Sequence, residues 1–407
     1  MARSPAPFLE EANRIGRFLG EAAVRHGGRS TWLVDAHAVV DGVWQEQART
    51  AAANLAEGTA GIGWFLARLA STVGDSGMAE LAVEALVHAL DQVEELVASQ
   101  RLGLLYGATG VAWAAIDAGR VLDRGDLVAA GRRAGLRAAA ASHQRGVEVA
   151  PGYFAGRAGT LGGLVALSDA MKDIAVVEAA AAAARALVER PVPAETDALG
   201  VGLANGASGV GLALASWAAR ADDAQALAVA ADAFRSERAW WCPRQGWYGA
   251  ATQAWDDDRS LSRSLASGAA GIGLARLSAW PALRHLCLAE VGAVIEIVRE
   301  PPPRHAVDAS IGLGASGEIE LLIGAAMTLS EPVHLAAARQ LGNRLLERAT
   351  AQGGYAYGPA NHPHEPSLLY GLAGTALVMM RLEDPGLAPL AVLPAFGRPR
   401  PSNPEAP

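Results

Sequence analysis

A Gly-x-x-Gly signature followed by an apolar run occurs seven times in this chain of 407 residues. Successive first glycines are separated by 49, 49, 50, 62, 46 and 57 residues. A recurring period of this length is typical of repeat architectures, in which each unit buries its apolar face on its neighbours. The length alone suggests two or three domains, but a repeat fold need not divide in that way. The seven pairs are Gly58/Gly61, Gly107/Gly110, Gly156/Gly159, Gly206/Gly209, Gly268/Gly271, Gly314/Gly317 and Gly371/Gly374.

Each period holds two predicted helices. The run after each glycine pair, such as GIGWFLARLA, is apolar nearly all round and predicts a buried helix. The stretches 78–98 and 126–143, upstream of two pairs, have apolar residues at helical spacing with charges on the other face. Strand signals are nearly absent. The predicted fold class is therefore all-α, with each unit made of an amphipathic helix followed by a buried one.

The first and last repeats decide between an open array and a closed ring. An open array requires polar terminal units, but LAEGTAGIGWFLARL and SLLYGLAGTALVMMRL are as apolar as the middle repeats. We therefore expect an α/α toroid of seven helical hairpins, with apolar helices inside and a pocket on the axis where the Gly-x-x-Gly ends converge. The toroid should cover residues 1–395 as one domain. The Pro-rich segment 396–407 is expected to be a disordered tail.

Composition excludes several classes of function. A formal net charge of −8 gives no electrostatic footprint for nucleic acid. The uncharged stretch 198–219 is long enough to cross a bilayer. It is rich in Gly and interrupted by Asn205 and Ser208, so it is interpreted as a buried helix. No membrane association is expected, and without a signal-peptide core the protein is predicted to be cytoplasmic. Two cysteines, Cys242 and Cys287, cannot form a disulfide framework or a multi-cysteine metal site.

The motif sequences resemble a known family. With SLASGAAGIGLARL (264–277) and SLLYGLAGTALVMMRLEDP (367–385), the chain is similar to the lanthionine synthetase C-like cyclases from about residue 50 to 395. The resemblance implies an α/α toroid. It also implies an enzyme that adds Cys thiols of a ribosomal precursor peptide to dehydroalanine or dehydrobutyrine, closing thioether rings.

The resemblance also implies a zinc site, from which this sequence departs. Typical members have a Cys just before the fifth motif and a Cys-His pair just before the sixth. Here Ala266 and Ser267 precede the fifth motif, and Gly312 and Leu313 precede the sixth. Asn205 stands before the fourth motif, where zinc-bearing members have His. Since Ala, Gly and Leu side chains offer no ligand atom, we expect no metal site and no cofactor.

Five polar residues near the motifs are the predicted catalytic residues: Arg157, Asn205, Tyr106, His305 and Asp308. Arg157 would stabilise an enolate or activate a thiol, or else form a salt bridge with a neighbouring hairpin. Asn205 would bind a substrate carbonyl, or else cap a helix. Tyr106 would donate to an enolate, or else bond to backbone. His305, with Asp308 close to it, is a natural proton shuttle ahead of the sixth motif.

Four further residues are predicted to contact the substrate. Tyr153 and Tyr370 precede the third and seventh motifs, and Ser267 precedes the fifth. Trp247 lies in the aromatic segment 239–260, in the longest gap between motifs. That segment is either a loop that contacts a peptide or an aromatic lid packed on its own repeat, and the sequence does not decide between them.

Three functions remain on this evidence. The first is a zinc-independent, stand-alone cyclase that acts on a dehydrated ribosomal precursor peptide, with separate kinase and lyase proteins performing dehydration. The second is a catalytically inactive toroid that binds the precursor and scaffolds those proteins. The third is a glycan-active enzyme, which requires two carboxylates in the pocket. Glu57 and Glu318 are the acidic residues next to the motifs.

Overall fold

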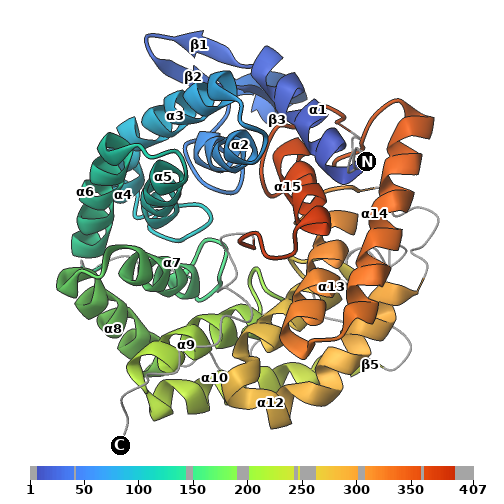
Figure 1. Cartoon of the computed structure of the whole chain (residues 1–407). Helices are drawn as coiled ribbons and strands as arrows, with labels where there is room; N and C mark the ends of the chain where they lie inside the picture. Colours follow the sequence, from blue (N-terminus) through green and yellow to red (C-terminus); the bar gives the residue numbers. More distant parts are fainter. Residues whose placement is uncertain are drawn as a thin grey trace, which may run out of the picture.

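Two concentric rings of helices surround one axis (Figure 1). The computed structural model describes residues 7–40, 43–143, 150–189, 201–242, 246–247, 263–300, 308–358 and 362–389. The inner ring contains α2 (Thr59–Val73), α5 (Ala108–Val121), α7 (Arg157–Met171), α9 (Ala207–Ala221), the first part of α12 (Ala269–Arg299), α13 (Ala315–Leu329) and α15 (Leu372–Glu383). The outer ring contains α1 (Pro7–Glu21), α3 (Ser76–Asp91), α4 (Val93–Ala98), α6 (Gly125–Ser142), α8 (Ile174–Glu189), α10 (Ala224–Glu237), the second part of α12 and α14 (Pro332–Gln352). The predicted helical toroid is confirmed.

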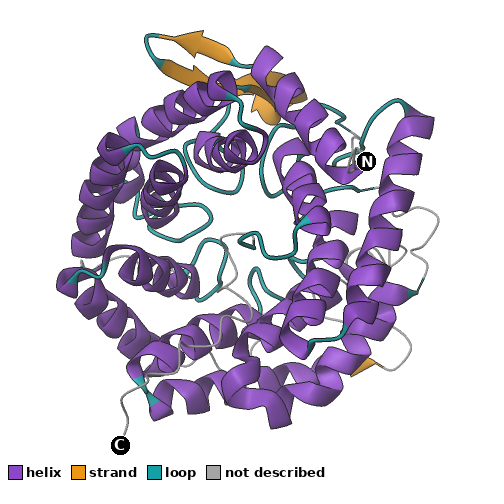
Figure 2. Ribbon diagram, in the orientation of Figure 1, coloured by secondary structure: helices purple, strands orange, loops and turns teal. Residues whose placement is uncertain are grey.

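Burial separates the two rings as the sequence predicts. In α2, every residue from Thr59 to Ala70 except Arg68 is buried. In α1, by contrast, one helical stripe is buried and the other face meets solvent. A helix that is apolar on all sides is stable only when neighbours cover it completely. Figure 2 shows how the inner helices obtain that cover from each other and from the outer ring.

Short connections join each inner helix to the outer helix that follows it. Gly74, Lys172, Asp222 and Ser330 end α2, α7, α9 and α13 in the left-handed region, with φ of 73°, 52°, 54° and 59°. Each donates its N–H back to the helix that it ends, and the next helix begins two residues later. The packed unit is thus an inner helix followed by an outer one. The sequence predicted that the amphipathic helix comes first in each hairpin. That order is wrong, because the short connection follows the inner helix and the longer one follows the outer helix.

The fifth unit has no separate connecting loop. α12 continues from the inner ring to the outer ring through a kink at Pro281, and Leu283 has non-helical angles of φ −123° and ψ 26°. Proline removes one backbone hydrogen bond and clashes with the preceding turn, so a kink replaces the tight turn of the other units.

The N-terminal helix closes the ring. α1 packs along α15, so the outer helix of the seventh hairpin comes from the opposite end of the chain (Figure 1). The Phe8 N–H donates to Glu383 Oε1 at 3.2 Å, and the Tyr355 hydroxyl donates to Glu11 Oε1 at 2.8 Å. The N-terminal segment therefore joins the beginning of the fold to its end.

Small hairpins add to the helical rings. β1 (Val24–His26) pairs with β2 (Arg29–Thr31), β3 (Leu33–Val40) with β4 (Val43–Thr50), and β5 (Trp241–Cys242) with β6 (Gly246–Trp247); η1 (Arg238–Trp240) is a short 3₁₀ turn. Gly27 and Gly28 have φ of 56° and 71°, as a two-residue hairpin turn requires. Trp32, just after β2, is buried and donates its indole N–H to Leu19 O at 2.8 Å. None of these hairpins was predicted, although the Gly27-Gly28 pair is a sequence signal for the first of them.

The glycine pairs allow the loops before the inner helices to approach closely. A Cβ at Gly110 would lie 1.7 Å from Leu104 O, and one at Gly61 would lie 2.0 Å from Leu55 O. Such distances exclude any side chain. Backbone hydrogen bonds of 2.8–3.0 Å then link each motif to the next around the axis. The links are Leu55 and Ala56 N to Leu105 O, Leu104 N to Gly159 O, Tyr153 and Phe154 N to Ala204 O, Ala204 N to Ala266 O, Ala266 N to Gly312 O, Gly312 N to Leu369 O, and Leu369 N to Ala56 O.

Candidate functional site

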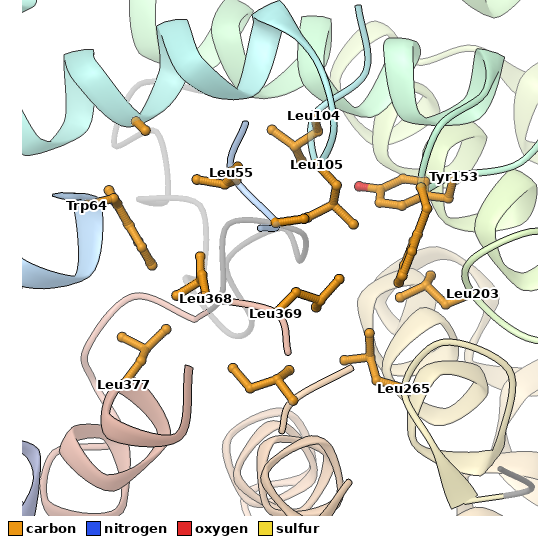
Figure 3. Close-up of a cluster of buried hydrophobic side chains, with 14 of the residues drawn as sticks. Leu55, Trp64, Leu104, Leu105, Tyr153, Leu203, Leu265, Leu368, Leu369 and Leu377 are labelled. Atoms are coloured by element: carbon orange, nitrogen blue, oxygen red, sulfur yellow. The ribbon is translucent and has the colours of Figure 1, made fainter. Parts of the chain in front are cut away.

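An apolar layer fills the axis beneath the converging loops (Figure 3). It is made by the residue three positions before each motif: Leu55, Leu104, Tyr153, Leu203, Leu265, Ile311 and Leu368, all at most 3% exposed. Tyr153, a predicted substrate-binding residue, belongs to this layer. Its hydroxyl lies against α7, where a Cβ at Gly162 would be 2.7 Å away. Burial raises the pKa of Tyr153, so this side chain is a neutral part of the core.

The residue directly before each motif is at least partly exposed, although the two residues before it are buried. We call these seven the mouth residues, because they surround the axis above the apolar layer. They are Glu57, Tyr106, Ala155, Asn205, Ser267, Leu313 and Tyr370.

Three mouth residues form a hydrogen-bonded cluster. The Tyr106 hydroxyl lies 3.2 Å from Glu57 Oε1 and 3.0 Å from the Tyr370 hydroxyl. These side chains come from the first, second and seventh motifs, and the seventh lies beside the first only because the ring closes. Two predicted site residues are thus brought together, and Glu57, which the sequence offered only as an acidic neighbour of a motif, joins them. The signal that could have found it is its position before the first motif, equivalent to those of both tyrosines.

Burial controls the protonation of this cluster. It raises the pKa of Tyr106 and of Tyr370, and the nearby Glu57 carboxylate raises both further. Both hydroxyls are therefore neutral O–H donors near pH 7. Burial also raises the pKa of Glu365, whose side chain accepts the Ser367 N–H at 3.3 Å, and the charge of Glu57 adds to that effect.

Asn205 and Ser267 occupy another part of the mouth. Asn205 is exposed, and its side chain makes no hydrogen bond within the described residues. Its Oδ1 lies over Gly152, where a Cβ would be 2.8 Å away. Ser267 is partly buried, and its N–H donates to Ser264 Oγ at 3.1 Å. Both lie at the mouth, apart from the tyrosine cluster.

Arg157 and Asp308 have structural contacts instead. Arg157 begins α7 and directs Nη1 to Ala186 O of α8, at 3.4 Å, so it does not join the mouth cluster. This contact joins a backbone carbonyl within the same hairpin, so it differs from the salt bridge to a neighbouring hairpin that was the alternative for Arg157. The Asp308 carboxylate accepts the Ser310 N–H at 2.7 Å and the Gly358 N–H at 2.9 Å. It thereby fixes the loop before α13 to the loop after α14.

Trp247 is packed in the interior. It is 1% exposed, lies against α12, and meets Trp241 edge to face at a centroid distance of 4.4 Å. Trp247 is therefore part of the interior, and as placed it does not offer its indole to a peptide at the surface. Residues 248–262 of the same segment, the predicted catalytic His305 and the tail 396–407 lie outside the described residues.

The residues at the family's zinc positions do not fit a metal ion. Ala266, Gly312 and Leu313 have no ligand atom in their side chains. A Cβ at Gly312 would lie 2.6 Å from the Tyr370 ring, so that ring occupies the space a side chain would need there. Within the described residues, no group of three or more His, Cys, Asp or Glu side chains could hold a metal.

Glu318, the other acidic residue beside a motif, is buried and fully engaged. It accepts two bonds from Arg263, of 2.8 and 2.7 Å. A buried carboxylate paired in this way is not free to act on a ligand. The carboxylate pair that a glycan-active site would take from Glu57 and Glu318 is therefore not assembled.

The fold and the mouth define a closed α/α toroid with a polar cluster on an apolar floor. A family model described as lanthionine synthetase C-like protein matches residues 50–393, and the chain belongs to this family. A solved structure, nisin cyclase, is similar with a TM-score of 0.59 and 18% identity, over 81% of this chain and 88% of that chain. At this identity the likeness shows the fold. No curated protein matches the sequence. None of the helices in the described part of the chain is long and apolar enough to cross a membrane.

Proposed function

We propose that this protein is a zinc-independent lanthipeptide cyclase. It would add Cys thiols of a dehydrated ribosomal precursor peptide to dehydroalanine or dehydrobutyrine, forming thioether rings. Family membership supports a cyclase-type function. The observation that carries the zinc-independent form is the Glu57–Tyr106–Tyr370 cluster, with the Tyr370 ring beside the position where the family has a zinc ligand.

The chemistry does not require a metal. A free thiol with a pKa near 8.5 is roughly 3% thiolate at pH 7, a shortfall of about 2 kcal/mol. Holding the thiol and the alkene in contact can contribute about 7–11 kcal/mol. The remaining need is a donor for the developing enolate and a proton for the α-carbon. The two neutral tyrosine hydroxyls of the mouth are donors of the right type.

Kinase and lyase proteins would supply the substrate. The reaction uses an alkene that is made from Ser or Thr by dehydration. We assign that dehydration to separate proteins, and the addition itself requires no cofactor.

A scaffold is the second candidate. The lack of ligand side chains at Ala266, Gly312 and Leu313 favours a toroid that binds the precursor and the dehydrating proteins without closing rings. The two proposals differ in whether thiols of the precursor disappear in its presence.

Thiol counting tests the proposal. A dehydrated precursor that contains Cys is incubated with and without the protein, alkylated and weighed by mass spectrometry, because cyclisation leaves the mass unchanged. We expect loss of alkylatable thiol that persists with a chelator. Full alkylation in both samples would contradict the cyclase; the scaffold would be supported if, in a separate reaction, the protein also improves dehydration of the unmodified precursor by the kinase and lyase proteins. Cys287 will not disturb the count, because it is buried and burial raises its pKa to about 11.

A further inference from the structure

We infer that Glu57, Tyr106 and Tyr370 form one proton path, which takes the proton from the attacking thiol and delivers it to the α-carbon of the dehydroamino acid. This inference rests on the proposed function and assigns the acid and the base within it. Glu57 is the base, Tyr370 is the acid, and Tyr106 connects them.

The arrangement of the three side chains carries the inference. Glu57 Oε1 and the Tyr370 hydroxyl both lie within hydrogen-bond distance of the Tyr106 hydroxyl, at 3.2 and 3.0 Å. Each of the three is partly exposed at the mouth, so each can meet a bound peptide. Within this geometry a proton can pass from one end of the cluster to the other without entering water.

The loop that carries Glu57 is held firmly. The Glu57 N–H donates to Asn54 Oδ1 at 2.8 Å, and Asn54 is buried. The neighbouring Leu55 and Ala56 N–H groups bond to Leu105 O of the second motif. A base fixed in this way keeps its distance to the second motif, from which Tyr106 extends.

The steps balance without a further reactant. Glu57 takes the thiol proton, and the S–Cβ bond forms as the Cα=Cβ π bond breaks, giving an enolate. Tyr370 gives its proton to the α-carbon and receives one from Tyr106, which receives one from the protonated Glu57. Nothing is oxidised or reduced. The Tyr106 hydroxyl has two hydrogen-bond partners. It donates to Glu57 before the reaction and to Tyr370 while the proton is transferred.

The protonation states agree with these roles. Burial raises the pKa of both tyrosines, so neither can serve as the base near neutral pH, and both keep the proton that they must donate. The carboxylate of Glu57 is the group of the cluster that can accept one.

Three substitutions test the path: Glu57→Gln, Tyr106→Phe and Tyr370→Phe. Ring closure is followed by thiol loss, and the configuration at the α-carbon by chiral chromatography after hydrolysis. General acid–base groups contribute about 10²–10⁴-fold, so Glu57→Gln should slow ring closure by that order. Tyr370→Phe should slow it and give mixed α-carbon configurations, because solvent then supplies the proton. Tyr106→Phe should slow ring closure, since it breaks the path between the two ends, but should keep a single configuration, because Tyr370 still donates its own proton to the α-carbon.

Tyr355→Phe is the matched control. It removes another hydroxyl that is bonded to a carboxylate, Glu11, on the side of the toroid where α1 lies. Its rate and product configuration should equal those of the wild type. If the wild type closes rings and the three mouth variants do so at the same rate with one configuration, the proton path is wrong and the cyclase proposal survives. If the wild type closes no rings, the proposed function fails and the path with it.

Discussion

The hydroxyls of Tyr106 and Tyr370 lie 3.0 Å apart although 264 residues separate them in the chain. Each stands directly before its Gly-x-x-Gly motif in the same Leu-Leu-Tyr-Gly context. Their motifs are the second and the seventh, and they become close because the seventh motif lies beside the first: α15 contacts α2, and the Leu369 N–H donates to Ala56 O. The polar cluster of the mouth is therefore a product of ring closure.

Close approach of the loops predicts a sharp contrast between two glycines. Gly110→Ala should destabilise the protein by about 1–3 kcal/mol or more, because the new Cβ would lie 1.7 Å from Leu104 O and the backbone must shift. Gly292→Ala, inside α12 with open space around it, should stabilise by about 0.5–1 kcal/mol. Denaturant unfolding of both variants measures the difference. Equal stabilities would show that the glycine pairs are not required by close approach.

Because α1 supplies the outer helix of the seventh hairpin, its buried residues should contribute as much to the free energy of unfolding as residues of the central core do. Ile15→Ala should lower the free energy of unfolding by about 2–5 kcal/mol, because it leaves a cavity between α1 and the rest of the toroid. Arg17→Ala, on the exposed face of the same helix, should change it by less than about 0.5 kcal/mol. Thermal unfolding reports both. A small effect of Ile15→Ala would mean that α1 is a peripheral addition.

The position of the Tyr370 ring predicts that restoring the ligand side chains alone will not restore a metal site. The variant with Ala266→Cys, Gly312→Cys and Leu313→His should bind zinc weakly, because the side chain at 312 meets the Tyr370 ring. Adding Tyr370→Ala should tighten binding at least about tenfold, or ~1.4 kcal/mol. Metal analysis after dialysis against graded free zinc tests this without any activity assay. Tight binding by the first variant would contradict the steric argument.

The partly buried carboxyl of Glu365 predicts that removing its charge stabilises the protein by an amount that depends on pH. Burial raises its pKa and the charge of Glu57 adds to this, while the hydrogen bonds from Ser367 and the nearby His362 oppose it; the net shift is upward, so the folded state holds this proton more tightly than the unfolded state. Its stabilising contribution is complete below the unfolded pKa and is lost as pH rises through the folded pKa. Glu365→Gln should therefore raise the melting temperature relative to the wild type at pH 8 more than at pH 4.

The control for that experiment is Glu178→Gln, at an exposed position of α8. It should shift the melting temperature little, and equally at both pH values. If Glu365→Gln behaves in the same way, the carboxyl of Glu365 is solvated in the folded protein.

Much of the architecture could be predicted because it depends on local sequence. The period of the glycine pairs and the apolar character of the runs after them predict the inner helices and their burial. The order of the two helices within each hairpin was predicted wrongly, because it depends on short connections such as that from Lys172 to Ile174. Lys172 adopts the left-handed conformation there, and a non-glycine residue gives little sequence signal for such a turn. The β1–β2 hairpin was missed because its Gly27-Gly28 turn lies outside the repeat.

The candidate site was predicted less well than the fold. Tyr106, Tyr370, Asn205 and Ser267 lie at the mouth, since their position before a motif sets their level on the axis. Tyr153 is buried because it lies three residues before its motif, at the level of the apolar layer. Trp247 is buried because it packs against α12. The position of a residue relative to its motif indicated whether its side chain lies at the mouth or in the core, and its residue type did not.

The sequence by itself determined that seven apolar helices must be covered on all sides, and hence that they close into a ring. Repeating glycines and helical periodicity are sufficient for that, because they act within one repeat or between adjacent ones. Only the tertiary structure decided which mouth residues meet. Glu57, Tyr106 and Tyr370 are joined by contacts of 3.2 and 3.0 Å that depend on side-chain direction and on the approach of the seventh motif to the first. Such contacts link the two ends of the chain, and no local pattern encodes them.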